Sequence, residues 1–277
     1  KKLSKEDSPQ SSLKNSDFKK QKALAFAPSQ DFYPTAPNGN NILLSETADK
    51  ANSGELKLIG AGNDPLATMM ALCYKKDFDA AFGISDKLFQ THLNVPTFWN
   101  QVATCHLLKG NERKALLFYN KALEVKANYV PALNNIAVIY NKNGQDQKAQ
   151  VALQRALSKG VFAKTPRYNL AFLMLEYGLA TKSLPLFKSL SEDTPGDIEL
   201  RVGLANSYAL MERWSEAWEQ FSAIPDSRRK NPDVGLNMAL VAHKLGKKDF
   251  AKNILSATAV NSSAKKYAER LSEVIGE

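Results

Sequence analysis

The sequence has few of the residues that build catalytic and metal sites. It holds two cysteines and three histidines, and none of the histidines, His92, His106 or His243, has a Cys or His at the spacing of metal ligands. It also lacks a Gly-rich phosphate loop, an HExxH motif and a nucleophile elbow. These absences argue against a metal site, a cofactor and an enzymatic activity, and they leave His106 with a structural role.

Long apolar runs are also lacking. No stretch of the sequence approaches the ~20 apolar residues of a membrane-spanning helix, so we expect a soluble chain. The first residue is Lys1 rather than Met. This start indicates a processed precursor or a trimmed chain, in which any targeting signal would be missing.

The chain carries an excess of basic residues, but they are not gathered in one region of the sequence. The formal net charge is +9, yet Lys and Arg alternate with Glu and Asp, and the densest basic clusters are short, at residues 228–230, 247–248 and 265–266. We interpret these clusters as solvated loops and helix faces. Attraction to an acidic partner or to anionic lipid headgroups is the alternative, and nucleic-acid binding is not expected.

The sequence does contain a repeat with a period of thirty-four residues. A glycine recurs as Gly110, Gly144, Gly178 and Gly246, and Glu212 stands in its place once. Small residues recur at two further places, in the series Ala103, Ala137, Ala171, Ala205, Ala239 and in the series Ala115, Ala149, Ser183, Ala217, Ala251. A period of this length is typical of stacked supersecondary units.

Within each unit the apolar spacing predicts two helices separated by the glycine. Trp99, Val102 and Ala103 follow the i, i+3, i+4 pattern of one helical stripe, and the glycine can adopt the left-handed conformation that ends a helix. Pro185 is tolerable only in the first turn of a second helix. Pro225 is expected to cut the second helix of the fifth unit short.

These positions resemble the consensus of the tetratricopeptide repeat. In one unit the matching residues are Trp99, Val102, Ala103, His106, Ala115, Tyr119 and Ala122, and in the next they are Leu133, Ile136, Ala137, Tyr140, Ala149, Leu153 and Ala156. The resemblance covers residues 62–265 and implies an all-α fold. We expect a right-handed superhelical solenoid of about six helical hairpins.

The domain organisation follows from the repeat. Residues 1–55 are polar, without sustained periodicity, and are expected to form a flexible leader, while residues 56–277 form the solenoid. Its units are predicted at about 62–95, 96–129, 130–163, 164–197, 198–231 and 232–265. A lone helix over 262–275, with Tyr267, Leu271 and Ile275 at helical spacing, is expected to cap the last hairpin, because repeat arrays need a polar-faced cap.

The two cysteines fall on the first helices of neighbouring units. At ~100° per residue, Cys73 and Cys105 point to flanks that can face each other. A disulfide between them is geometrically feasible in a compartment that oxidises thiols. Two free thiols buried in the core are the alternative.

The resemblance also implies a site. In this family the first helices line a concave groove, and the corresponding groove residues here are Asn100, Thr104, Asn134, Val138, Asn141, Tyr168, Phe172, Leu175 and Asn206. Amides suit a peptide backbone, and the aromatic side chains offer an apolar anchor. The alternative is that these residues pack against the chain's own leader or cap helix.

The function that we expect is a non-enzymatic scaffold that binds a partner peptide or helix in this groove. The architecture resembles bacterial envelope lipoproteins that assist assembly of pilus, secretion or motility machines, which implies the periplasm or an outer-membrane anchor through a lipid tether missing from this sequence. A cytoplasmic adaptor is the alternative. A further alternative is an accessory subunit of an enzyme or of a nucleic-acid complex. The identity of the partner and the oligomeric state do not follow from the sequence.

Overall fold

The computed structural model describes residues 64–158, 163–262 and 264–276, and within these ranges the chain forms α-helices and no strand. Six helices open the hairpins: α3 Pro65–Tyr74, α5 Pro96–Leu108, α7 Val130–Lys142, α9 Lys164–Glu176, α11 Ile198–Leu210 and α14 Pro232–Lys244. Six close them: α4 Phe78–His92, α6 Glu112–Val125, α8 Asp146–Leu157, α10 Ala180–Asp193, α12 Trp214–Ser222 and α15 Lys248–Ala257. The leader predicted for residues 1–55 lies outside the described residues.

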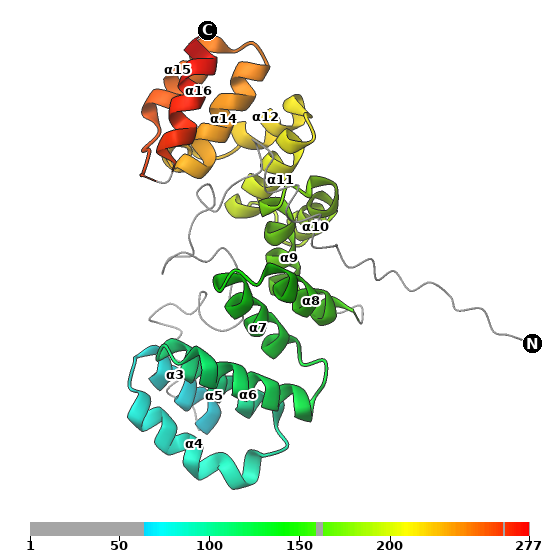
Figure 1. The fold of residues 1–277 in the computed structure, drawn as a ribbon, viewed down its shortest axis with the longest axis vertical. Helices are drawn as coiled ribbons and strands as arrows, with labels where there is room; N and C mark the ends of the chain where they lie inside the picture. The colour runs from blue at the N-terminus through cyan, green and yellow to red at the C-terminus, as the bar shows by residue number, and fades with distance from the viewer. Residues whose placement is uncertain (1–63, 159–162, 263, 277) are drawn as a thin grey trace, which may run out of the picture.

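The hairpins stack in chain order into an elongated solenoid (Figure 1). Each closing helix contacts the opening helix of its own hairpin and, up to α12, the opening helix of the next hairpin. Opening helices also contact one another at α3–α5, α7–α9, α9–α11 and α11–α14. The prediction of an all-α solenoid of about six hairpins is confirmed.

The hinge of each hairpin is one residue in the left-handed conformation. Gly110, Gly144, Gly178 and Gly246 have φ values of 86°, 68°, 70° and 73°. Glu212, the exception in the series, has a φ of 58°. The turn geometry is therefore kept where the glycine is lost, at the conformational cost that an L-residue pays in this region. The corresponding residue of the first hairpin, Lys76, behaves in the same way, with a φ of 64°.

Small residues allow the two helices of a hairpin to approach closely. Ala103 on α5 and Ala115 on α6 are fully buried, as are Ala137 and Ala149 in the next hairpin. Methyl groups at these points permit the short end of the ~8–10 Å range of interaxial distances.

The two prolines act differently. Pro225 precedes the four-residue helix α13 Asp226–Arg229, and α12 ends early at Ser222, as predicted. Pro185 lies inside α10, which begins at Ala180, so the expectation that it occupies a first turn is wrong. The helix continues through a position whose amide cannot donate a hydrogen bond.

The last hairpin is covered by α16 Lys265–Gly276. Leu271 and Ile275 are buried, and they share a hydrophobic cluster with Leu236 and Ala239 of α14 and Ala251 of α15. Basic and acidic side chains occupy half of the other positions of α16. The prediction of a capping helix at the C-terminal end is confirmed.

Two helical glycines offer a matched pair of substitutions. A Cβ on Gly235 of α14 would lie 2.5 Å from the carbonyl oxygen of Arg229 and would also overlap the Thr258 side chain, whereas a Cβ on Gly83 of α4 meets nothing within 4 Å. Gly235→Ala should lower the free energy of unfolding by at least about 2 kcal/mol. Gly83→Ala should raise it by about 0.5–1 kcal/mol. Urea unfolding followed by circular dichroism measures both, and equal effects of the two changes would contradict this packing.

Candidate functional site

The predicted groove residues lie on four opening helices. Asn100 and Thr104 are on α5, and Asn206 is on α11. The predicted groove residues between positions 134 and 141 are on α7, and those between positions 168 and 175 are on α9. All of them are buried in the structure except Tyr168, which is half-buried.

Two of the groove amides are joined to other asparagines across the hairpin boundaries. Asn169 Nδ2 donates to Asn134 Oδ1 at 2.8 Å, and Asn237 Nδ2 donates to Asn206 Oδ1 at 3.0 Å. These bonds tie α7 to α9 and α11 to α14. A peptide backbone was one expected partner of the groove amides, but the Oδ1 atoms of Asn134 and Asn206 already accept hydrogen bonds within the stack.

Asn141 also has a partner inside the fold. Its Nδ2 donates to Asp146 Oδ1 at 3.0 Å, and the hydroxyl of Tyr177 donates to the other oxygen of the same carboxylate. The buried Asp146 therefore links α7 to α8 and to the C-terminal end of α9.

Two amide atoms of the predicted groove residues keep an unused hydrogen-bonding capacity. Asn100 Oδ1 and Asn206 Nδ2 are buried and find no partner among the described residues. Leaving a buried polar atom unsatisfied costs about 1–3 kcal/mol. Such atoms are uncommon in folded proteins, and each calls for an explanation.

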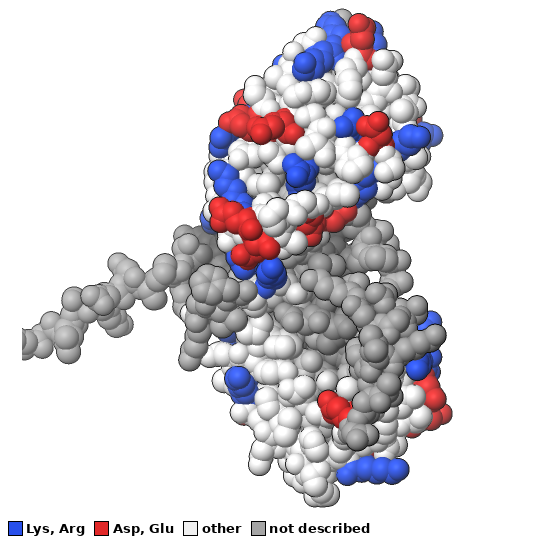
Figure 2. Space-filling model, turned by 180° about the vertical axis from the view of Figure 1, so that it is seen from behind, with Lys and Arg blue, Asp and Glu red and all other residues white. Residues whose placement is uncertain are grey.

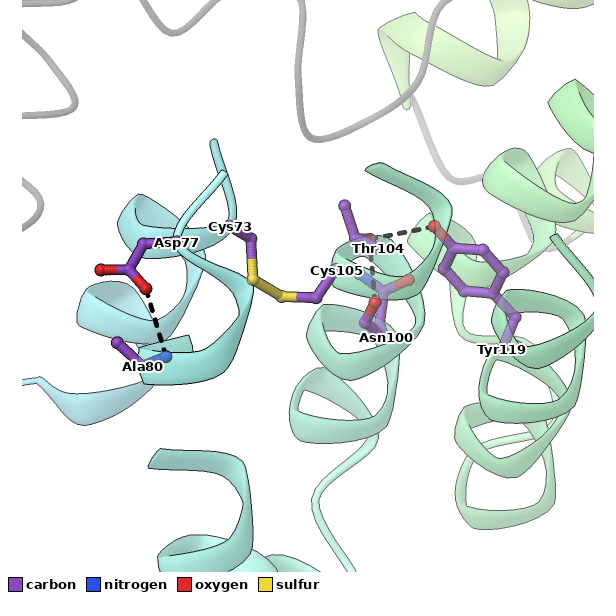
Figure 3. The surroundings of a disulfide bond; sticks show 7 residues. All are labelled: Cys73, Asp77, Ala80, Asn100, Thr104, Cys105 and Tyr119. Carbon is purple, nitrogen blue, oxygen red and sulfur yellow. Dashed lines mark hydrogen bonds between the residues drawn. A yellow bond between two sulfur atoms is a disulfide. The ribbon is translucent and has the colours of Figure 1, made fainter. Parts of the chain in front are cut away.

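Thr104 points into its own hairpin. Its hydroxyl lies 2.9 Å from the hydroxyl of Tyr119 on α6 and donates to the carbonyl oxygen of Asn100 at 2.9 Å (Figure 3). Burial raises the pKa of Tyr119, and the Thr104 hydrogen bond opposes that rise in part. Thr104 thus fixes the pairing of α5 with α6.

The aromatic residues of α9 form a short ladder. The rings of Tyr168 and Phe172 are 4.4 Å apart, and Phe172 meets Phe187 of α10 edge-on at 4.9 Å. Leu175 and Val138 are both core residues. Burial is the main cause of the raised pKa of Tyr168, and the carboxylates of Glu199 and Asp197 add to it.

A charged cluster beside Tyr168 was missed by the sequence analysis. Arg228 Nη2 lies 3.1 Å from Glu199 Oε1 and 2.6 Å from Asp233 Oδ2. The Arg228 side chain is only 14% exposed. Burial raises the pKa of both carboxyls, and Arg228 opposes that rise. The interpretation of residues 228–230 as a solvated basic cluster is therefore wrong for Arg228. No local pattern in the sequence pairs this arginine with a glutamate twenty-nine residues earlier.

Cys73 of α3 and Cys105 of α5 form a disulfide (Figure 3). Their Cα atoms are 5.2 Å apart, within the usual range for such bonds, and both residues are fully buried. The bond ties the first hairpin covalently to the second.

His106 serves packing, and no group of residues that could hold a metal ion is found in the described part of the chain. The His106 ring stacks on Phe82 and Phe118 at 4.6 and 5.2 Å. Burial lowers its pKa, and the nearby Lys114 and Lys109 add to the effect. None of the helices in the described ranges is long and apolar enough to cross a bilayer.

The visible surface carries charges of both signs. Figure 2 shows acidic and basic side chains interspersed over the described residues on that face. The described surface seen there has no extended field of one sign, the feature that typically steers nucleic acids.

Two family models, both described as a tetratricopeptide repeat, match residues 96–129 and 118–151. The chain contains tetratricopeptide repeats. The matched residues cover α5, α6 and α7 and reach into α8, and the repeat's hinge glycines and small residues recur in the neighbouring hairpins. A curated protein, the photosystem I assembly protein Ycf3 of Cyanophora paradoxa, is 38% identical over 60 residues. That match spans 22% of this chain and about a third of Ycf3 (34%).

Solved tetratricopeptide-repeat structures share the fold. PilF of Pseudomonas aeruginosa superposes with a TM-score of 0.63 at 12% identity, covering 74% of this chain and 96% of that one. PilW, a type IV pilus biogenesis factor, gives 0.56 at 16% identity, with 81% and 100% covered. YrrB, described as having an unusual peptide-binding site, gives 0.57 at 18% identity, with 69% and 95% covered. At these identities the likeness concerns the fold.

Proposed function

We propose that the chain is a non-enzymatic scaffold that holds a peptide or helix of another protein against its opening helices, at the predicted groove residues. The observation that carries this proposal is the half-buried ring of Tyr168 on α9, which lies 4.4 Å from the ring of Phe172 among the predicted groove residues and can supply an aromatic anchor. Asn100 Oδ1 on α5 and Asn206 Nδ2 on α11 are an acceptor and a donor that find no partner among the described residues, and a polypeptide backbone offers both complements.

We further propose that this scaffold works in a bacterial envelope, in the periplasm or anchored at the outer membrane, and assists assembly of a complex such as a pilus. The fold likeness to PilW and PilF supports this setting. The disulfide supports it too, because such bonds form and persist in oxidising compartments such as the periplasm and are rare in the cytosol. A cytoplasmic adaptor would hold both cysteines reduced in cells, which acid quenching followed by thiol alkylation reveals.

The binding site is tested by photo-crosslinking. Benzoylphenylalanine in place of Tyr168 should crosslink the partner in cells, whereas the same group in place of the exposed Lys252 on α15 should not. Phe172 is unsuitable for this test because it is 2% exposed and packs on Phe187. Its loss would destabilise the fold by about 3–5 kcal/mol.

Crosslinking to the same proteins from both positions would overturn the assignment of the site. So would the absence of any adduct at Tyr168 when the protein is expressed at its native level.

A further inference from the structure

A second groove lies between two closing helices, and we call it the lateral groove. It is a cavity of about 440 Å³ between α6 and α8, and its apolar floor comprises Leu123, Leu133, Ile136 and Ala152. It shares no residue with the predicted groove. Ile136 and Asn134 both belong to α7, but at about 100° per residue they project from nearly opposite sides of that helix.

The rim of the lateral groove is basic. Lys148 and Arg155 line it, together with the amides of Asn120 and Gln147, and its lining contains no carboxylate. Within the described ranges neither cation forms an ion pair. Two acids of α6 pair with other lysines and not with these two cations: Glu124 with Lys121, and Glu112 with Lys142.

Both cations are held in place without being neutralised. Lys148 Nζ donates to Gln145 Oε1 at 2.9 Å and lies 5.4 Å from the centre of the Tyr140 ring. Arg155 donates to the carbonyl oxygen of Ala127 in the loop before α7. A guanidinium has five N–H donors, so Arg155 keeps several for a ligand.

The spacing of these groups defines what fits between them. Lys148 and Arg155 are seven residues apart on α8, about 10 Å along the helix axis. Val151 lies between them in the same wall and is 55% exposed, so an apolar side chain of a ligand can reach it. An extended chain covers the same distance in about three residues.

We propose that the lateral groove binds an acidic peptide segment of a partner protein, in extended conformation, with an apolar side chain between two carboxylates. The apolar side chain enters the cavity over Ile136 and Ala152, and the two carboxylates meet Lys148 and Arg155. Rim charges of this kind act mainly on the association rate and on specificity. Binding should therefore weaken as salt is added.

The test uses three short peptides with blocked termini and a fluorescent label, titrated by fluorescence polarisation against the whole chain. The first places one leucine midway between two glutamates that are four residues apart, so that all three side chains project from one face of an extended chain. The second replaces the leucine by serine, and the third replaces the glutamates by lysine. The first peptide alone should bind with a saturating curve. Lys148→Glu should weaken it about tenfold, equivalent to about 1.4 kcal/mol.

The control is Lys252→Glu on α15, which makes the same change of charge on another exposed lysine. It should leave the affinity for the glutamate–leucine peptide unchanged, as should Tyr168→Ala, so this site and the proposed groove succeed or fail separately. Equal weakening by Lys148→Glu and Lys252→Glu would overturn the proposal. Equal affinity for the leucine and serine peptides, or the absence of saturation, would also overturn it.

Discussion

Replacing Arg228 by alanine is expected to lower the free energy of unfolding by about 3 kcal/mol, which is the lower end of the range for breaking a buried ion pair. The change leaves Asp233, whose side chain is 7% exposed, without its counter-ion. Glu199 also loses this counter-ion, but its side chain is 33% exposed and therefore partly solvated. The cost should therefore not reach the upper end of that range. The midpoint of urea unfolding measures the loss.

The loss should depend on pH in a defined direction. Burial already raises the folded-state pKa of Glu199 and Asp233, and removing Arg228 raises both further because its positive charge opposed that effect. A carboxyl with a raised folded pKa contributes stability that is full below its unfolded pKa, about 4, and is lost as the pH rises through the folded value. Arg228→Ala should therefore cost less at about pH 4 than at about pH 7.5.

An exposed pair provides the control for the Arg228 experiment. Lys121 Nζ lies 2.6 Å from Glu124 Oε2, but the two side chains are 47% and 62% exposed. Lys121→Ala should cost less than about 1 kcal/mol. If Arg228→Ala costs no more than Lys121→Ala at neutral pH, the cluster does not stabilise the junction of α11, α13 and α14.

Removing the disulfide should have a comparably large effect, confined to one end of the solenoid. The cysteines are 32 residues apart, and chain entropy for a loop of that size predicts about 3.5 kcal/mol of stabilisation. Changing both cysteines to alanine avoids a free thiol. Because each hairpin contacts only its neighbours, the loss should fall on α3 and α4.

Hydrogen exchange of backbone amides locates this effect. In the double variant the amides of α3 and α4 should exchange faster, while those of α14 and α15 should keep their rates. Reducing the unaltered protein under partly denaturing conditions should reproduce the pattern. Uniform acceleration along the chain would indicate that the solenoid unfolds as one unit and would contradict the local role assigned to the bond.

The solenoid could be predicted because its determinants are local and periodic. The hinge glycines and the small residues of the hairpins recur at one offset, and the opening helices after α3 begin at the predicted starts of the repeats, from Pro96 to Pro232. Glu212 shows the limit of this signal. Its left-handed turn is imposed by the stack and not by its own preference. Pro185 likewise stays helical because the flanking residues are held by packing.

The groove could be predicted less well, because side-chain partners depend on the packing between hairpins. An asparagine on an opening helix has the same local signal whether it faces a ligand or a neighbouring asparagine. Only the structure distinguishes Asn134, whose oxygen accepts from Asn169, from Asn100, whose oxygen finds no partner among the described residues. Arg228 was missed for the same reason, since its partners lie on α11 and α14.

The sulfur–sulfur bond also turns the segment between its two ends into a covalent ring that contains all of α4. A protease that cuts a single peptide bond there nicks the polypeptide without dividing it. The two pieces migrate as one band in a denaturing gel and separate when a thiol reagent is added. A cut inside this ring thus leaves no fragment to diffuse away while the bond is oxidised.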